Sequence, residues 1–113
     1  MIKQDEIYLK HIIDAIKKIK TYCKDIENED DFLEDCKTQD AVVRNLEVIG
    51  EAVSKVSSGL KNKNKEIQWR KVVDTRNLLI HGYFGVSYAA VWSIIKIHIP
   101  TLEKQIKKIL KNL

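Results

Sequence analysis

Arg76, Asn77, His81 and Tyr83 form the densest group of chemically active side chains in the sequence. A guanidinium can bind two phosphate oxygens at once. An imidazole exchanges protons near neutral pH, because its unperturbed pKa is about 6.5. The phenol that follows could contact a ligand or control access to it. Together, these residue types predict a site that binds a phosphate group and transfers protons beside it.

A helix predicted over Ile67–His81 must position these side chains. Its apolar residues recur at steps of three and four, and Arg76 occupies one place in that apolar series. A buried guanidinium is costly unless it is paired or solvated, so Arg76 needs a partner. From the residues alone, the simplest hypothesis is an ion pair with Glu47, Glu51 or Asp74, and a bound phosphate is the other.

The end of this helix constrains the geometry of the site. Gly82 is a natural left-handed cap, so we expect the helix to end at His81. Residues five apart on a helix point about 140° away from each other, so Arg76 and His81 of one chain make an awkward site. Asn77 precedes His81 by four residues and lies on nearly the same face. We expect Asn77 to orient the imidazole or to touch a ligand.

Apolar periodicity predicts three further helices, over Asp5–Ile26, Thr38–Ser57 and Val91–Leu113. The segment between the first two is acidic and weakly periodic, which suits a short helix or an ordered connection. The polar run Lys61–Lys65 is predicted to be a loop. Four main helices with short links favour an all-α fold, an antiparallel helical bundle with one possible additional short helix.

Local signals mark particular points in these helices. Thr38 or Asp40 can cap the start of the second one. Gly50 lies inside that helix, where glycine costs about 1 kcal/mol relative to alanine, so close contact with another helix is a plausible reason for it. Pro100 lacks a backbone N–H and clashes with the preceding turn. It therefore predicts a kink just before residue 100.

Length and composition fit a single domain over residues 1–113. Hydrophobic residues make up 44% and charged residues 32%, with only 4 Gly and 1 Pro, a composition that favours helices. Cys23 and Cys36 do not make a disulfide framework, and the N-terminal residues lack the apolar core of a signal peptide. The longest apolar run is too short to span a bilayer. We therefore expect a cytoplasmic protein without membrane contact.

Charge is unevenly distributed along the chain, although the formal net charge is only +4. Residues 25–40 are sharply acidic and would repel a phosphate backbone or dock a basic partner. Basic residues precede the motif and close the chain, at Lys61, Lys63, Lys65, Arg70, Lys71, Lys104, Lys107, Lys108 and Lys111. A basic region can attract phosphate backbones, while a solvated surface that maintains solubility explains most of these individual lysines.

The sequence does not indicate a metal or cofactor site. His11, Cys23, Cys36 and His98 lack the close pairing of zinc ligands, and no phosphate-cradling glycine loop is present. We expect no metal and no cofactor.

The spacing Arg-x4-His-x-Tyr, formed here by Arg76, His81 and Tyr83, resembles the signature of the HEPN-domain ribonucleases, most closely the HepT-type toxins. The resemblance extends to Ala41–Ala52 and to Val91–Ile95, so it covers most of the chain. It implies a HEPN-like bundle and a ribonuclease activity.

In the resembled family, two protomers bring their motif helices together, so that two arginines and two histidines surround one phosphate. RNA cleavage without a metal needs a base for the ribose 2′-hydroxyl, an acid for the leaving oxygen and positive charge on the phosphate. The resemblance thus implies a homodimeric, metal-independent endoribonuclease that acts on RNA such as tRNA or mRNA. Arg76 would hold the phosphate and His81 would transfer protons, leaving a cyclic phosphate product.

The same resemblance implies that the protein is the toxin of a type VII-like toxin–antitoxin pair. In HepT-type systems a minimal nucleotidyltransferase antitoxin of MntA type transfers AMP to the tyrosine of the motif, which is Tyr83 here. The added phosphate beside Arg76 would repel RNA. Two rival hypotheses remain: a non-catalytic nucleotide- or substrate-binding subunit of a nucleotidyltransferase pair, and a structural dimerisation domain.

Overall fold

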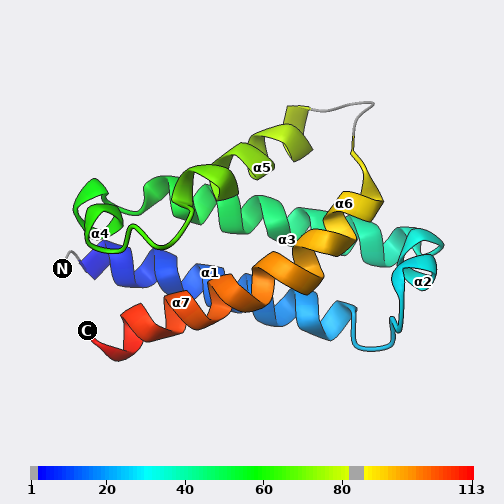
Figure 1. Cartoon of the computed structure of the whole chain (residues 1–113), viewed down its shortest axis with the longest axis horizontal. Coiled ribbons are helices and arrows are strands. Elements are labelled where there is room, and N and C mark those ends of the chain that lie inside the picture. Colours follow the sequence, from blue (N-terminus) through cyan, green and yellow to red (C-terminus); the bar gives the residue numbers. More distant parts are fainter. Residues whose placement is uncertain (1–2, 82–85) are drawn as a thin grey trace.

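A computed structural model describes residues 3–81 and 86–113, and for Ile80 and His81 it describes the backbone alone. These residues form helices and no strand. The long helices α1 (Lys3–Tyr22), α3 (Cys36–Lys55), α5 (Trp69–His81) and α7 (Ile99–Lys111) run alternately in opposite directions (Figure 1). The short helices are α2 (Glu29–Leu33), α4 (Ser58–Lys63) and α6 (Tyr88–Ser93). The predicted all-α bundle of four main helices is therefore confirmed.

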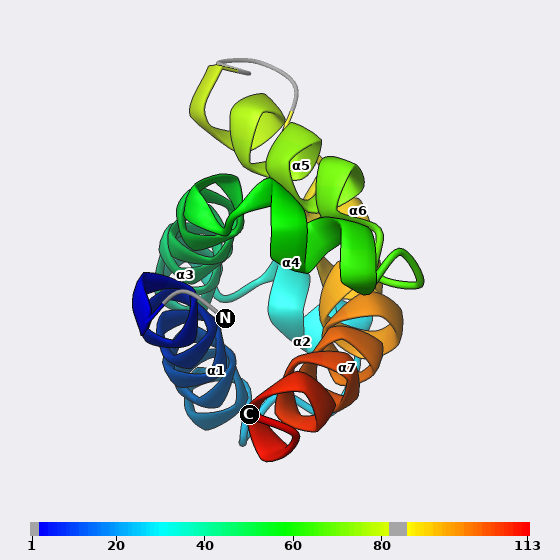
Figure 2. The ribbon, with the colours of Figure 1, turned by 90° about the vertical axis from the view of Figure 1, so that its left-hand side faces the viewer.

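The core lies mainly between α1, α3 and α7. Apolar residues at steps of three and four place one stripe of each helix inside. Fully buried side chains in this core include Leu9, Ile12, Ile16, Ile19, Phe32, Val42, Ile49, Val53 and Ile106. α5 instead lies at one edge of the bundle, where it packs on α3 (Figure 2). None of the described helices is long and apolar enough to cross a membrane.

The start of α3 differs from the sequence prediction. Asp35, not Thr38 or Asp40, caps this helix, and its carboxylate accepts hydrogen bonds from the backbone N–H of Thr38 at 3.0 Å and its hydroxyl at 2.8 Å. Both bonds lower the pKa of Asp35, and the bond from the backbone N–H has the larger effect. Both oxygens of Asp35 reach position 38, whereas a residue at 38 or 40 would already lie inside the helix.

The segment after α3 contains a helix that the sequence analysis predicted as a loop. α3 ends at Lys55, before the predicted Ser57, and Ser57 then caps α4 by accepting from the backbone N–H of Leu60 at 3.3 Å. Asp5 of α1 is buried and accepts from the backbone N–H and hydroxyl of Ser57 at 2.8 and 2.6 Å. Because these contacts fix the cap and Leu60 is buried, the turn continues as far as Lys63.

The last predicted helix, over Val91–Leu113, is interrupted where Pro100 suggested. α6 begins earlier, at Tyr88, and a π-helical turn η1 (Ile94–His98) precedes α7. The backbone N–H of Ile99 donates to the carbonyl of Ile94, one residue farther than in an α-helix. Pro100 has no N–H to continue the regular pattern, so the irregular turn falls just before it.

A buried carboxylate joins α1 to α7. Glu103 accepts a hydrogen bond from the ammonium group of Lys20, and its second oxygen lies 3.4 Å from Lys107 Nζ. The hydrogen bond from Lys20 is the main reason why the pKa of Glu103 is lowered, although burial opposes that shift. When Glu103 is ionised, this cluster holds α7 against α1.

Candidate active site

α5 is the element that positions the predicted site residues. At its N-terminal end Trp69 is buried, and its Nε1 donates to the carbonyl of Asn64 at 3.0 Å. Val72 is partly buried on the apolar side of the helix. This anchoring fixes the rotation of α5 on α3, and with it the direction in which Arg76 leaves the helix.

Arg76 lies where α5 crosses α3, directly over Gly50. A methyl group added at position 50 would lie 2.1 Å from Cβ and 2.7 Å from Cγ of Arg76, and 3.4 Å from the carbonyl oxygen of Val72. No side chain fits in that space, since real Cβ atoms essentially never approach another atom within 3.0 Å. The close helix contact predicted from Gly50 is confirmed, and its partner is the arginine of the motif.

The guanidinium of Arg76 is held by two neighbours. Nη2 lies 3.0 Å from Oε2 of Glu51, and Nη1 donates to Oδ1 of Asn77 at 2.9 Å. Nε is buried and has no hydrogen-bond partner among the described residues. The side chain as a whole remains 30% exposed. The terminal nitrogens of the guanidinium are thus ordered while the group stays open to a ligand.

The geometry selects one of the three ion-pair partners considered from the sequence. Glu47 pairs with Arg44 at 3.7 Å, and Asp74 pairs with Arg70 at 3.5 Å. Only Glu51 reaches Arg76, and its other oxygen lies 3.5 Å from Lys55 Nζ.

Asn77 contacts Arg76, a neighbour that helical spacing does not predict. The expected contact of Asn77 with His81 stays a prediction. Adjacent residues on a helix do not normally face each other, so spacing gave no signal for the Asn77–Arg76 hydrogen bond. The bond forms because the arginine side chain is long enough for Nη1 to reach Oδ1 of the adjacent asparagine.

The remaining motif residues lie at and beyond the end of α5. His81 is the last residue of that helix, as predicted, and its side chain is outside the described part of the structure. Tyr83 and the predicted cap Gly82 also lie outside the described residues. The roles predicted for His81 and Tyr83 therefore stay predictions.

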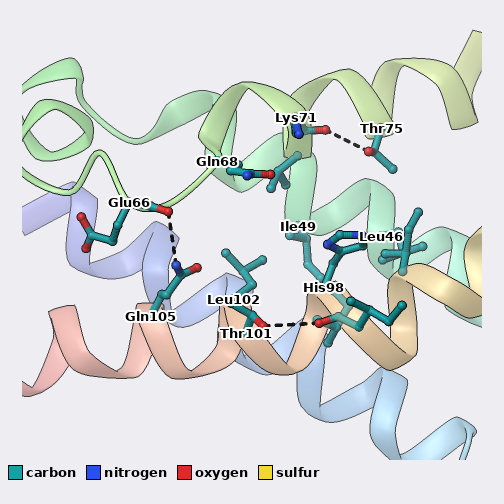
Figure 3. Close-up of a pocket in the computed structure, with 14 residues that line it drawn as sticks. Leu46, Ile49, Glu66, Gln68, Lys71, Thr75, His98, Thr101, Leu102 and Gln105 are labelled. Atoms are coloured by element: carbon teal, nitrogen blue, oxygen red, sulfur yellow. Dashed lines mark hydrogen bonds between the residues drawn. The ribbon is translucent and has the colours of Figure 1, made fainter.

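Two hollows flank α5. The first, of about 420 Å³, lies between α5, α3 and the η1–α7 segment and has an apolar floor that includes Leu46, Ile49 and Leu102 (Figure 3). His98 projects into it from η1, and Gln105 closes one end by donating to the carbonyl of Glu66 at 3.3 Å. The charged side chains on its lining are one carboxylate, Glu66, and one ammonium, Lys71.

The second hollow, of about 690 Å³, lies on another side of α5, between that helix, the end of α3 and the α4 region. Its lining is rich in basic and amide side chains and includes Lys61, Asn62, Lys65, Arg70 and Asn77. We call it the α4–α5 groove. Among the residues that the structure describes, no group of three or more His, Cys, Asp and Glu side chains is arranged to hold a metal ion.

Comparison with known proteins gives a consistent set of relatives. A model of the family described as ribonuclease HepT-like matches residues 12–109. A protein of Caldanaerobacter subterraneus named as a candidate RNase is 39% identical, over 98% of this chain and 98% of its own length. A probable ribonuclease HepT of Thermococcus cleftensis is 40% identical, over 98% of this chain and 100% of its own.

One relative is about twice as long as this chain, which spans 50% of it. A protein of Methanocaldococcus jannaschii, named as a gamma-glutamylcyclotransferase and candidate RNase, is 40% identical over the whole of this chain, which spans 50% of that protein. No solved structure matches this chain. The family match covers most of the sequence, including α5 with Arg76 and His81. The chain therefore belongs to the HepT-like ribonuclease family.

Proposed function

We propose that this protein is a metal-independent endoribonuclease in which Arg76 binds the scissile phosphate and His81 transfers protons. The supporting observation is the guanidinium held at the α3–α5 crossing, ordered by Glu51 and Asn77 yet still 30% exposed, five residues before His81 on the same helix. The 2′-oxygen of ribose attacks the phosphorus, the bond to the 5′-oxygen breaks, and the products are a cyclic phosphate and a 5′-hydroxyl. Imidazole removes one proton and supplies the other.

The ion pair with Glu51 is weak enough for a phosphate to replace it. Both side chains are partly exposed, at 30% for Arg76 and 47% for Glu51, and pairs in such surroundings contribute about 0–1 kcal/mol. A phosphate offers two oxygens to the guanidinium fork and carries more charge than a carboxylate in the transition state. Glu51 would thus hold Arg76 in position until RNA arrives.

The proposed enzyme acts as a homodimer. Five residues correspond to about 7.5 Å along a helix and about 140° around it, so Arg76 and His81 of one α5 cannot easily contact the same phosphate. Two antiparallel motif helices bring the arginine of each protomer toward the histidine of its partner. This arrangement would supply two guanidinium groups and two imidazoles to one substrate.

We further propose that the protein is the toxin of a type VII-like toxin–antitoxin pair. A minimal nucleotidyltransferase antitoxin would transfer AMP to the phenolic oxygen of Tyr83, releasing pyrophosphate from ATP. Tyr83 lies seven positions after Arg76 and two after His81, so the new negative charge would fall beside the phosphate-binding arginine. Charge repulsion and steric exclusion would then prevent RNA from binding.

A binding module without catalysis is the second candidate function. It is favoured by one observation: Arg76 already has protein partners in Glu51 and Asn77, which is sufficient for a structural or phosphate-binding arginine. In this alternative the protein binds nucleotide or substrate for a nucleotidyltransferase and cleaves nothing.

Cleavage of total cellular RNA in excess EDTA separates the two functions. Arg76→Lys keeps the charge but loses the two-pronged contact, and His81→Ala removes the proton carrier, so both variants should lose activity at least about 100-fold. Arg44→Lys and His11→Ala are matched controls on exposed positions of α3 and α1 and should cleave like the wild type. Circular dichroism and light scattering check the fold and the dimer.

Undiminished cleavage by His81→Ala would remove this residue as the proton carrier. A folded wild-type protein that binds nucleotide but cuts no RNA would favour the binding module. For the tyrosine, Tyr83→Phe should remain a nuclease and escape silencing by the nucleotidyltransferase, whereas AMP found on another residue of a silenced variant would refute the assignment.

A further inference from the structure

The α4–α5 groove differs in charge from the first hollow, which Figure 3 shows and which we call the cleft. Three cationic side chains line the groove, Lys61, Lys65 and Arg70, against the single carboxylate of Asp74. The cleft has one charge of each sign on its lining and an apolar floor. Of these two hollows, only the groove has the excess positive charge that attracts a polyanion.

The cations of the groove are available to a ligand. Lys61 and Lys65 make no ion pair among the described residues. Arg70 lies 3.5 Å from Asp74 through Nε, but these side chains are 91% and 60% exposed. A pair in that setting contributes little, and the terminal nitrogens of Arg70 remain open for a phosphate.

The groove leads directly to the candidate active site. Asn77 lines it and accepts the hydrogen bond from Nη1 of Arg76 at 2.9 Å. Arg70 and Asn77 are seven positions apart on α5, which corresponds to about 10 Å along the helix. That distance exceeds the size of one phosphate group, so a chain with several phosphates could occupy both ends.

The composition of the groove favours contact with a phosphate backbone over recognition of bases. The only aromatic residue of its lining is Trp69, and this side chain is 7% exposed and bonded through Nε1 to the carbonyl of Asn64. Stacking of bases needs an exposed aromatic face. Binding in this groove would therefore be strongly salt-dependent and tolerant of sequence.

We propose that the α4–α5 groove binds the phosphates of the RNA strand adjacent to the scissile one and guides that strand to Arg76. This inference rests on the proposed ribonuclease function, and it adds Lys61, Lys65 and Arg70 as substrate-binding residues. Asp74 weakens the field at the middle of the groove, so its removal should strengthen binding.

The test measures binding of a short fluorescein-labelled single-stranded RNA by the full chain over a range of salt concentrations, in the His81→Ala background to prevent cleavage. Each phosphate contact on a single strand contributes about 0.7 to the slope of log affinity against log salt. Replacing all three groove cations with glutamine should reduce the slope by about 2. Asp74→Asn should raise affinity at low salt.

A charge-matched control uses three exposed lysines of α7 that do not line the groove: Lys104, Lys108 and Lys111. Changing these three to glutamine removes the same net charge and should leave the slope nearly unchanged. Equal losses in both triple variants would mean that only net charge matters, and a wild-type slope in the groove variant would mean that RNA binds elsewhere. Either result overturns the proposal.

The experiments distinguish an error in the groove proposal from an error in the proposed ribonuclease function. If the groove cations determine the salt slope but the wild type cleaves no RNA, the ribonuclease proposal fails and the binding site stands. If a folded groove variant cleaves RNA at 150 mM salt, about the physiological ionic strength, with unchanged KM and kcat, the groove is not part of the substrate path. The expected result is a raised KM with kcat nearly unchanged.

Discussion

Substituting Gly50 with alanine is the most direct perturbation of the contact between α3 and α5. The added methyl carbon would lie 2.1 Å from Cβ of Arg76, whereas ordinary contact begins at 3.4 Å. The two helices must therefore separate locally by about 1.3 Å, the difference between these distances. A rotamer change of Arg76 cannot relieve the overlap, because Cβ is attached to the backbone.

The expected stability change follows from two opposing terms. Overpacking costs about 1–3 kcal/mol, and replacing a helical glycine with alanine returns about 1 kcal/mol. The net loss should be about 0–2 kcal/mol, and each kcal/mol lost lowers Tm by about 4–8 °C in a small domain. Cleavage should fall by about 100-fold at temperatures where the variant is folded, since a misplacement of about 1 Å has that effect.

Gly59→Ala is the matched control. Gly59 also lies in a helix, α4, but a methyl group there would meet only the hydroxyl of Ser57, at 4.0 Å. This variant should be as stable as the wild type or slightly more stable, with unchanged cleavage. Thermal unfolding followed by circular dichroism gives Tm, and initial rates on RNA give activity.

One further variant separates the contact of the added methyl group with Cβ of Arg76 from its contact with Cγ. Alanine at position 76 retains Cβ, so Gly50→Ala should still destabilise the protein in the Arg76→Ala background. Full rescue there would mean that the longer side chain alone caused the clash. If Gly50→Ala matched Gly59→Ala in both Tm and cleavage, the argument that the helix crossing positions Arg76 would be wrong.

Three other substitutions test separate parts of the structure. Glu51→Gln should weaken the hold on Arg76, raising affinity for RNA while lowering kcat a few-fold, as measured by steady-state kinetics with the binding assay as control. Asp5→Ala leaves the partly buried backbone N–H of Ser57 without its acceptor, so urea unfolding should report a loss of about 1–3 kcal/mol with cleavage unchanged at 25 °C. Glu103 has a lowered pKa, so it stabilises the fold above its unfolded pKa of about 4.3 and that contribution is lost as pH falls through the folded value. Glu103→Gln should therefore show a smaller loss of stability below about pH 4 than the wild type does, in unfolding curves measured across that range.

The helical elements were predictable because their signals are local. Apolar residues at steps of three and four identify α1, α3, α5 and α7 from sequence alone, and Pro100 marks the irregular turn before α7. The errors were at boundaries: the start of α3 is set by the local cap Asp35, and the start of α4 depends on a long-range contact. α4 was predicted as a loop because nothing near it in sequence reveals that Asp5, 52 residues earlier, bonds Ser57 and fixes its cap.

The sequence by itself determined the types of side chain in the motif and the helix that bears Arg76, since spacing along a helix follows from backbone geometry. It also indicated that Gly50 faces a close neighbour. Only the tertiary structure decided that this neighbour is Arg76 and that Glu51 is its ion-pair partner. Glu47 and Asp74 were equally eligible from sequence, but each pairs within its own helix. The crossing of two helices far apart in the chain sets which carboxylate reaches the guanidinium, and no local pattern encodes that crossing.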